Sequence, residues 1–554
     1  MFDDKQIEAS QARMESARYG FDSVRGEIAS LVLPQQQGFN RKFGSQGQLH
    51  TNHQYDEYAA LALEDGVSAF EGFVIPRGQK WQKIILGNER LMESVVVQQW
   101  LETIETRLFA LRNDPKSGFT NAVHTSAQSL FAFGEQSMWV DKRFDPSGRF
   151  AGLSYQSEHL DGIFVENDAE GSPMRVHRKF TLTAEQLTMK FREGAPPKAK
   201  EAMAAQPAPR SNESFEIVHV IERNDRMMPG RIDPSGMPWR ACYYSMTDRK
   251  TFKSGGYRTM RRIVSRFDRA PGEDYGRGPA MRVLPAIRAS QIMMQDRVLA
   301  TEMAVKRPML APSDDLDSSV IDVGPFGITY GGIDDRGNKL LVPLDIAADL
   351  SGASELHGEI RATIDKAFYR DLLQINRELK THITAARTME EIGEKGILLA
   401  PLARQEQEWF APMMDVELDL MWEEGLLDDM PAEVIEYFQA DGGVHARYDN
   451  NLSRMQEAGA AAGYLRTAEQ IGLIAQFDPS VVGQFTREYP LSKVVPGLAS
   501  VNGIPARWRA TDEEKEAVDE AEQQKVMLDQ LLQAAPALGG AAKNIAEAEA
   551  IGGG

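Results

Sequence analysis

The residues of this chain that could do chemistry are paired carboxylates and scattered histidines. Adjacent aspartates occur at Asp314-Asp315, Asp334-Asp335 and Asp428-Asp429, and carboxylate oxygens of this kind can bind Mg²⁺. Solvated carboxylates in turns are far commoner than metal sites, so we assign these pairs no catalytic role. The nine histidines are spread out, with no His-Glu-x-x-His sequence and no Cys/His quartet. We therefore expect no metal ion and no cofactor.

Nucleotide chemistry is not indicated either. A phosphate-binding loop needs Gly-x-x-x-x-Gly-Lys-Ser/Thr, and the nearest segments, residues 115–118 and 254–257, lack that spacing. We expect neither an ATP-driven motor nor an enzyme. The single cysteine, Cys242, cannot form an internal disulfide, and we expect it to be a small buried hydrophobe in a reducing compartment.

Charge is segregated along the chain. The 554 residues carry a net charge of −19, yet residues 240–307 hold fifteen Lys or Arg against six Asp or Glu. Residues 401–449 hold thirteen Asp or Glu against two Arg, which we interpret as a solvated helix face. A chain this acidic is not a general nucleic-acid binder. The basic stretch 249–269 could touch nucleic acid locally, but we favour pairing with acidic surface on this chain or on a neighbouring subunit.

The bulk properties indicate a large soluble protein. A mass of 61.7 kDa suggests two to four domains. The first residues lack the basic and apolar regions of a signal peptide, and no apolar run approaches the ~20 residues that a bilayer span requires. We expect synthesis in the cytoplasm and no membrane partner.

The elements that must position these residues change character along the chain. Helical periodicity marks residues 1–33, 55–70 and 91–111. Short β-type runs separated by turns follow from 131 to 264, with a Pro/Ala/Lys stretch at 194–212 that predicts a loop.

Two long helices then flank a loop-rich segment. The first, about 280–305, has apolar residues on more than one face and so predicts packing on several sides. The second carries apolar residues at steps of three or four from Leu356 to Leu379. A further helix is expected at 388–424, interrupted near Pro401 and Pro412, with helical signals again from 431. The predicted fold class is α+β and predominantly α.

Three segments together resemble the portal, or head-to-tail connecting, proteins of short-tailed bacteriophages of the podovirus type. Residues 168–186 are similar to the family's acidic turn, Arg-x-Phe strand and Leu-Thr-Ala helix start. Residues 275–280, Tyr-Gly-Arg-Gly-Pro-Ala, resemble the turn before its first stem helix. Residues 384–391 are similar to its Thr-Ala-x-Glu-like element, and residues 402–421 with 425–427 resemble the long wing helix that follows. The resemblance extends over most of the chain.

The resemblance implies a portal fold with wing, stem, clip and crown regions, assembled as a ring. Its implied regions are a wing with a β-rich lobe at 1–270, stem helix 1 at 271–305, the clip at 306–352, stem helix 2 at 353–376, the channel loop and wing helices at 377–465, and the crown and C-terminal tail at 466–554.

The implied function is a dodecameric channel at one capsid vertex, through which double-stranded DNA is packaged and ejected. The implied partners are the terminase large subunit, the tail adaptor and other tail proteins, and the major capsid and scaffold proteins. The implied location is the virion, with assembly in the host cytoplasm. Another connector or adaptor ring protein is the alternative, although adaptors are usually shorter; a packaging enzyme would need a phosphate loop or a metal site.

The resemblance also implies candidate site residues. DNA contact is expected where the family has its channel loop, although these side chains could equally cap or salt-bridge helix ends: Arg377, Lys380, His382 and Arg387. Glu355 and Glu359 are candidates for the channel wall, because an acidic wall would avoid tight phosphate binding. Contacts of the clip with terminase or adaptor are expected from Asp314, Asp315, Asp334, Asp335 and Arg336.

Overall fold

The computed structural model describes residues 2–305 apart from 37, 40–53 and 232, residues 350–370, and residues 400–498 apart from 428, 441, 492–493 and 496–497. Between 306 and 349 it describes residues 309–310, 333, 336–339 and 342–343. The chain forms two compact units, residues 1–383 with 394–453 and residues 384–393 with 454–554. The mixture of helices and sheets confirms the α+β class.

The N-terminal part of the first unit is helical, as the periodicity predicted. The Asp3 carboxylate accepts a hydrogen bond from the amide of Lys5 and caps the first helix. The segment expected at 91–111 is divided at Ser94 into two helices. The helices are α1 (Asp4–Leu31), α2 (Tyr58–Val74), α3 (Glu89–Glu93), α4 (Val95–Asn113) and α5 (Phe119–Phe133).

Two antiparallel sheets form the β-rich lobe that the sequence predicted. The three-stranded sheet has the order β3-β2-β9 and consists of β2 (Glu135–Phe144), β3 (Phe150–Ser157) and β9 (Arg262–Arg266). The five-stranded sheet is a meander in the order β4-β5-β6-β7-β8, made of β4 (Ile163–Asn167), β5 (Pro173–Thr183), β6 (Ser214–Arg223), β7 (Trp239–Ser245) and β8 (Lys250–Tyr257).

Different helices cover the two faces of the five-stranded sheet, since alternate residues of a strand face opposite ways. On one face, Ile7 of α1 packs on a group that includes Val218 and Cys242. On the other face, α6 (Ala184–Phe191) and α7 (Pro197–Met203) pack on a group that includes Ile217. Cys242 is therefore a buried hydrophobe, as expected, and burial raises the pKa of its thiol.

The loop predicted at 194–212 is confirmed for residues 204–212 but is wrong for 197–203, where helix α7 lies. Pro197 occupies the first position of the helix, where its fixed φ is favourable and its missing N–H costs nothing. Ala199 and Ala202 then pack into the core against α6. The prolines and alanines that suggested a loop therefore have another role. Proline begins a short helix, and the alanines form its buried face.

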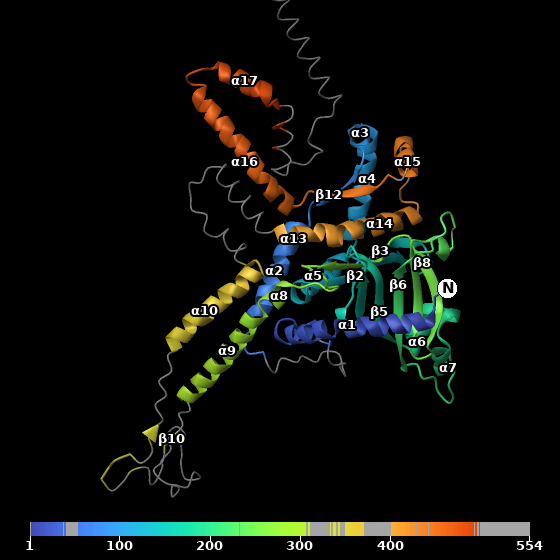
Figure 1. The fold of residues 1–554 in the computed structure, drawn as a ribbon, viewed down its shortest axis with the longest axis vertical. Helices are drawn as coiled ribbons and strands as arrows, with labels where there is room; N and C mark the ends of the chain where they lie inside the picture. The colour runs from blue at the N-terminus through green and yellow to red at the C-terminus, as the bar shows by residue number, and fades with distance from the viewer. Residues whose placement is uncertain are drawn as a thin grey trace, which may run out of the picture. The chain divides into compact units, whose positions relative to one another are not determined.

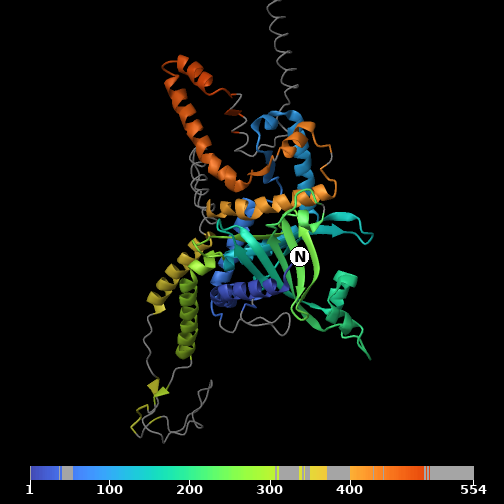
Figure 2. The same ribbon diagram turned by 45° about the vertical axis from the view of Figure 1, so that its right-hand side comes forward.

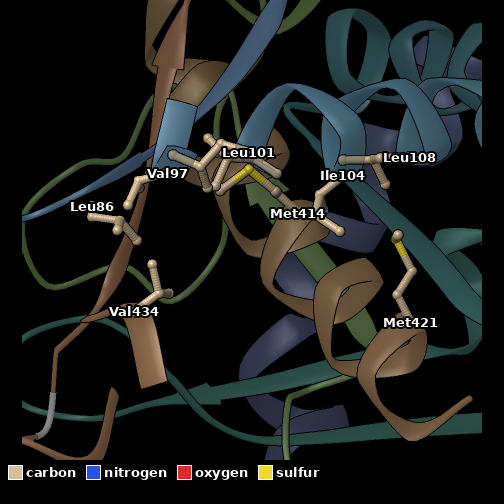
Figure 3. Packing of buried hydrophobic residues seen from close by; sticks show 9 residues of the cluster. Leu86, Val97, Leu101, Ile104, Leu108, Met414, Met421 and Val434 are labelled. Carbon is tan, nitrogen blue, oxygen red and sulfur yellow. The ribbon is translucent and has the colours of Figure 1, made fainter. Parts of the chain in front are cut away.

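A second core joins segments far apart in the sequence. Strand β1 (Gln82–Leu86) pairs antiparallel with β12 (Val444–Tyr448), and α4 packs on α14 (Ala411–Glu423) and α15 (Ala432–Gln439). Figure 3 shows the side chains that interdigitate there: Leu86, Val97, Leu101, Ile104, Leu108, Met414, Met421 and Val434. The burial of Val97, Leu101, Ile104 and Leu108 matches the helical spacing seen in the sequence.

The helix around Pro412 is continuous, but it passes through a π-helical turn directly before α14, near one of the predicted interruptions. The other predicted interruption, near Pro401, falls where the described residues begin. α13 (Ala400–Gln405) leads through a π-helical turn, Glu406–Phe410, directly into α14. Pro401 is the second residue of α13, and the wider π turn immediately precedes α14, in which Pro412 is also the second residue. The part of this prediction at 388–399 lies outside the described residues.

Helices α9 (Leu284–Val305) and α10 (Leu350–Ala367) run side by side and lead away from the sheets, as Figures 1 and 2 show. The short helix α8 (Pro279–Arg282) precedes α9, and a break at Val283 separates the two. Beyond the pair, β10 (Met309–Leu310) pairs antiparallel with β11 (Val342–Pro343).

The second unit contains most of α16 (Asn451–Ile474) and all of α17 (Ser480–Glu488). The rings of Tyr464 and Phe485 stack with centroids 5.6 Å apart and hold these helices together. Within the described parts of both units, no helix is long and apolar enough to cross a membrane.

Candidate functional site at the base of the α9–α10 helix pair

The α9–α10 pair is buried at one end, which we call its base, where α9 begins and α10 ends. Farther from the base, several apolar side chains of the pair are exposed to solvent. In α9, Leu284 and Ile287 are buried, whereas Val298 and Leu299 beyond them are exposed. In α10 the buried residues lie at the C-terminal end of the helix instead. Ile364 and Phe368 there are buried, whereas Leu356, nearer the start, is 52% exposed. Within the described part of the predicted apolar stripe, Ile364 and Phe368 are therefore covered and Leu356 is not. The part of the stripe from 371 to 379 lies outside the described residues.

Backbone contact between two turns fixes where the pair begins. Gly134 ends α5 with φ +77°, and a Cβ there would lie 2.5 Å from the carbonyl carbon of Arg277 and the nitrogen of Gly278. A Cβ on Gly276 would lie 2.3 Å from the carbonyl oxygen of Gly134. The turn at 275–279 and the end of α5 therefore touch main chain to main chain, which only glycine permits. We call this contact the glycine junction.

A buried ion pair lies beside the glycine junction. Arg25 of α1 donates to Glu135, the first residue of β2, across 2.5 Å, and both side chains are buried. The other oxygen of Glu135 accepts a 3.3 Å hydrogen bond from the amide of Gly276. Burial raises the pKa of Glu135 despite the opposing charge of Arg25. Helix α1, strand β2 and the turn before α8 are thus connected through one carboxylate.

A buried polar cluster connects both helices of the pair to the segment before α2. Ser290 donates to Asp56 across 2.5 Å, and Arg361 donates to both oxygens of Asp56 across 3.1 and 3.2 Å. Gln291 accepts hydrogen bonds from the amides of Tyr55 and Asp56. We call Asp56, Ser290, Gln291, His357 and Arg361 the base cluster.

The base cluster contains serine, histidine and aspartate but lacks the geometry of a hydrolase. In a catalytic triad the serine and the aspartate bind different ring nitrogens of the histidine. Here Ser290 Oγ and Asp56 Oδ2 both lie near Nε2 of His357, at 3.0 and 3.2 Å, and Nδ1 faces Arg297 at 3.4 Å. Asp56, Ser290 and His357 are also buried, so the arrangement holds helices together.

The electrostatics of the base cluster favour an ionised Asp56. Burial by itself raises the pKa of this carboxyl group. The hydrogen bonds from Ser290 and from the amide of Tyr58, together with the charge of Arg361, outweigh burial and lower the pKa below its usual value. The clustered donors thus stabilise a negative charge at the centre of the base.

The basic stretch pairs with acidic groups of the same chain, as favoured from the sequence. Arg261 lies 2.7 Å from Asp141 and 3.2 Å from Glu423, and Arg266 lies 3.3 Å from Glu408. Arg258 stacks over the ring of Trp422 at 3.9 Å. The acidic segment 401–449 is therefore not simply a solvated face, because part of its charge is neutralised by strand β9 and the turn between β8 and β9.

The structure places only some of the predicted site residues. Glu355 and Glu359 are exposed on α10, and Arg336 is exposed between Ile333 and Lys339, which form a β-bridge. The other candidates lie outside the described residues: Asp314, Asp315, Asp334, Asp335, Arg377, Lys380, His382 and Arg387. Groups of three or more His, Cys, Asp or Glu that could hold a metal ion are not found in the described ranges.

Little in the sequence predicted the base cluster. One signal was the four-residue spacing of His357 and Arg361, which puts two polar side chains on one face of a helix whose apolar stripe starts at Leu356. In α9, the adjacent polar residues Ser290 and Gln291 likewise interrupt a mainly apolar segment. Buried polar residues of this kind need partners, but the sequence does not reveal which ones.

Comparison with known proteins identifies the family of this chain. The family model described as bacteriophage head to tail connecting protein matches residues 4–508. A curated relative, named probable portal protein of Bordetella phage BPP-1, is 23% identical over 477 residues, which cover 85% of this chain and 83% of the relative. The family match includes the glycine junction, the base cluster and both helices of the pair. The chain belongs to the family of bacteriophage head to tail connecting proteins.

Proposed function

We propose that this protein is the portal of its phage, a dodecameric ring at one capsid vertex through which double-stranded DNA is packaged and later ejected. The observation that carries the proposal is the α9–α10 pair, which is anchored at its base and exposes apolar side chains such as Val298, Leu299 and Met303 farther out. Exposed apolar surface of this kind calls for a partner. Neighbouring copies in a closed ring would supply it.

The segment between α9 and α10 is the proposed clip. Its described strands, β10 and β11, lie at the end of the pair remote from the base (Figure 1), and we expect a ring to present them to other proteins. We propose that it docks the terminase large subunit during packaging and the tail adaptor afterwards, with Asp314, Asp315, Asp334, Asp335 and Arg336 as candidate contacts. The remaining proposed partners are other tail proteins and the major capsid and scaffold proteins, in the virion and, during assembly, in the host cytoplasm.

The proposed channel wall includes Glu355 and Glu359. Both are exposed on α10 and lie one helical turn apart. Carboxylates along a DNA path would repel phosphates and so prevent the tight binding that follows counterion release. Arg377, Lys380, His382 and Arg387 are proposed as the few cations that contact DNA in the channel loop.

Negative-stain electron microscopy and native mass of the purified protein test this proposal. Closed rings with a central hole wide enough for a DNA duplex are expected. A stable compact monomer at high concentration would contradict a conduit. We propose no enzymatic activity for this chain, and ATP hydrolysis by the purified protein would contradict that part.

The alternative function is that of another head-tail connector or adaptor ring protein. A portal should bind the terminase large subunit, whereas an adaptor should bind an existing portal ring. Pull-down with each purified partner separates the two functions.

A further inference from the structure

A row of side chains crosses the five-stranded sheet on the face that carries α6. Arg178 of β5 lies opposite His219 of β6, His219 lies opposite Tyr243 of β7, and Tyr243 lies opposite Lys253 of β8. The rings of His219 and Tyr243 stack with centroids 4.2 Å apart. Because directly opposed residues share a face of the sheet, these four side chains form a continuous row that ends at the edge strand β8.

Helix α6 adds another cation to this row. The ammonium of Lys190 lies 5.9 Å from the ring centre of Tyr243 and 5.8 Å from that of Phe191. The ammonium of Lys253 lies 5.5 Å from the same Phe191 ring. Two ammonium groups, one from a helix and one from a strand, thus gather around one pair of aromatic rings. We call Arg178, Lys190, His219, Tyr243 and Lys253 the basic strip.

The basic strip has more positive charge than nearby carboxylates neutralise. Glu158 pairs with both Arg178, at 2.9 Å, and Arg262, at 2.6 Å, so one carboxylate serves two guanidinium groups. Lys190 and Lys253 form no ion pair within the described part of the chain. The strip therefore retains a positive surplus on a chain whose net charge is −19.

The unpaired buried polar atoms beside the strip are hydrogen-bond donors. Arg262 donates to Nδ1 of His219 across 3.1 Å, so the neutral imidazole carries its proton on Nε2. Burial lowers the pKa of His219 well below its usual value and keeps the ring neutral. Nε2 of His219 and Nη1 of Arg262 have no partner among the described residues. Both atoms are buried, so the accessible groups of the strip are the ammonium groups of Lys190 and Lys253, which favour a ligand that offers negatively charged acceptors.

The aromatic rings of the strip do not offer a stacking platform. One face of Tyr243 is stacked on His219, and the edge-on ring of Phe191 packs 4.9 Å away. Binding of single-stranded nucleic acid normally uses free ring faces for its bases. Duplex DNA would need many more cations to overcome repulsion by this acidic chain. Carboxylates of a polypeptide, unlike nucleic-acid bases, do not need a free aromatic ring face. A few ammonium groups are enough to pair with them.

We propose that the basic strip is a docking surface for an acidic segment of a second protein, whose carboxylates pair with Lys190 and Lys253. This inference is independent of the proposed channel, because the strip lies on the β-rich lobe and not on the α9–α10 pair. The expected partner is a protein that carries a run of Asp or Glu side chains in an accessible segment.

Fluorescence anisotropy on the full chain tests this docking surface. The probe is a labelled peptide of alternating Glu and Ala, titrated at low and at high ionic strength. We expect saturable binding that weakens with salt, and a loss of about tenfold in affinity for the Lys190→Gln/Lys253→Gln variant, because two charged contacts are removed. Both lysines are exposed, so the variant should fold, which thermal unfolding checks.

The control variant is Lys5→Gln/Lys116→Gln, which removes the same charge from two other exposed lysines. It should bind the peptide within about twofold of the wild type, since it leaves the strip intact. Equal losses in both variants would show a general charge effect and overturn the proposal. Tighter binding of a labelled duplex or single-stranded oligonucleotide, with the same dependence on Lys190 and Lys253, would instead identify a nucleic-acid surface. Absence of saturable peptide binding would also overturn it.

Discussion

At the scale of single residues, stability depends on a buried ion pair between α4 and α14. Arg112 and Glu417 are both fully buried and bonded through two nitrogens, Nε at 2.9 Å and Nη2 at 2.5 Å. Gln82 accepts from Arg112, and Tyr155 donates to Glu417. The pair thus connects the second core with the three-stranded sheet.

Removing one partner of this pair should be costly. Arg112→Met leaves the Glu417 carboxylate buried without its counter-charge, so we expect the free energy of unfolding to fall by about 3–5 kcal/mol in urea denaturation. Arg107→Met, on the same helix but exposed, removes one hydrogen bond to the carbonyl of Leu426 and should lower the free energy of unfolding by no more than about 1 kcal/mol. The double variant Arg112→Met/Glu417→Leu should recover part of the loss. Similar small effects of all three variants would mean that the pair contributes little.

The base cluster predicts acid sensitivity. The pKa of Asp56 is lower in the folded protein than its usual value. The ionised carboxylate therefore contributes stability that is fully present above the unfolded pKa and is lost as pH falls through the folded pKa. Asp56→Asn should be less stable than wild type at about pH 6 and should lose less on acidification to about pH 3, measured by urea unfolding. Glu359→Gln, on the exposed side of α10, should follow the wild-type pH dependence.

At the scale of elements, the outer half of α9 should control assembly. Val298 and Leu299 are exposed there, and burial of both in a subunit contact would stabilise association. We expect Val298→Glu/Leu299→Glu to shift the native mass from rings to smaller species, because charged side chains would have to be desolvated at the contact. The control Met227→Glu/Met228→Glu changes two exposed apolar residues outside the pair and should leave rings intact. Rings that form equally well in both variants would exclude α9 as the contact.

Helix α10 carries the second prediction at this scale. Glu355→Lys/Glu359→Lys would replace repulsion of DNA by attraction, so the amount of nuclease-protected DNA in a packaging reaction should fall. Glu433→Lys/Glu436→Lys on α15 makes the same change of charge at another helix and should package normally. If rings of the α10 variant assemble and package as much DNA as the wild type, a repulsive wall is not needed.

The sequence predicted these elements unevenly, for physical reasons. The periodicity of α4 and of the base of α10 is local, so it was readable. The pairing of β1 with β12 depends on segments more than 350 residues apart, and neither strand has a partner nearby in the chain that would identify it. Glu417 looked like one more residue of an acidic, solvated helix, because its partner Arg112 belongs to a helix 305 residues earlier.

At the scale of the whole molecule, charge and apolar surface oppose each other in assembly. Each copy carries a net charge of −19, and neighbouring copies repel one another at low ionic strength. We expect moderate salt to increase the fraction of rings, with a native mass of about 740 kDa for twelve chains of 61.7 kDa. Native mass measured across a salt series checks this. Dissociation of rings by moderate salt would show that ion pairs, rather than apolar contacts, hold the copies together.

The glycine junction limits how this chain can change over time. Gly134 and Gly276 each occupy the space that a side chain on the other would need. A harmful substitution at one position therefore has no compensating substitution at the other, because the partner is already the smallest residue. Relieving the clash would require an insertion or deletion that moves a whole turn. The two positions should therefore tolerate few substitutions, and no single substitution elsewhere should restore the contact.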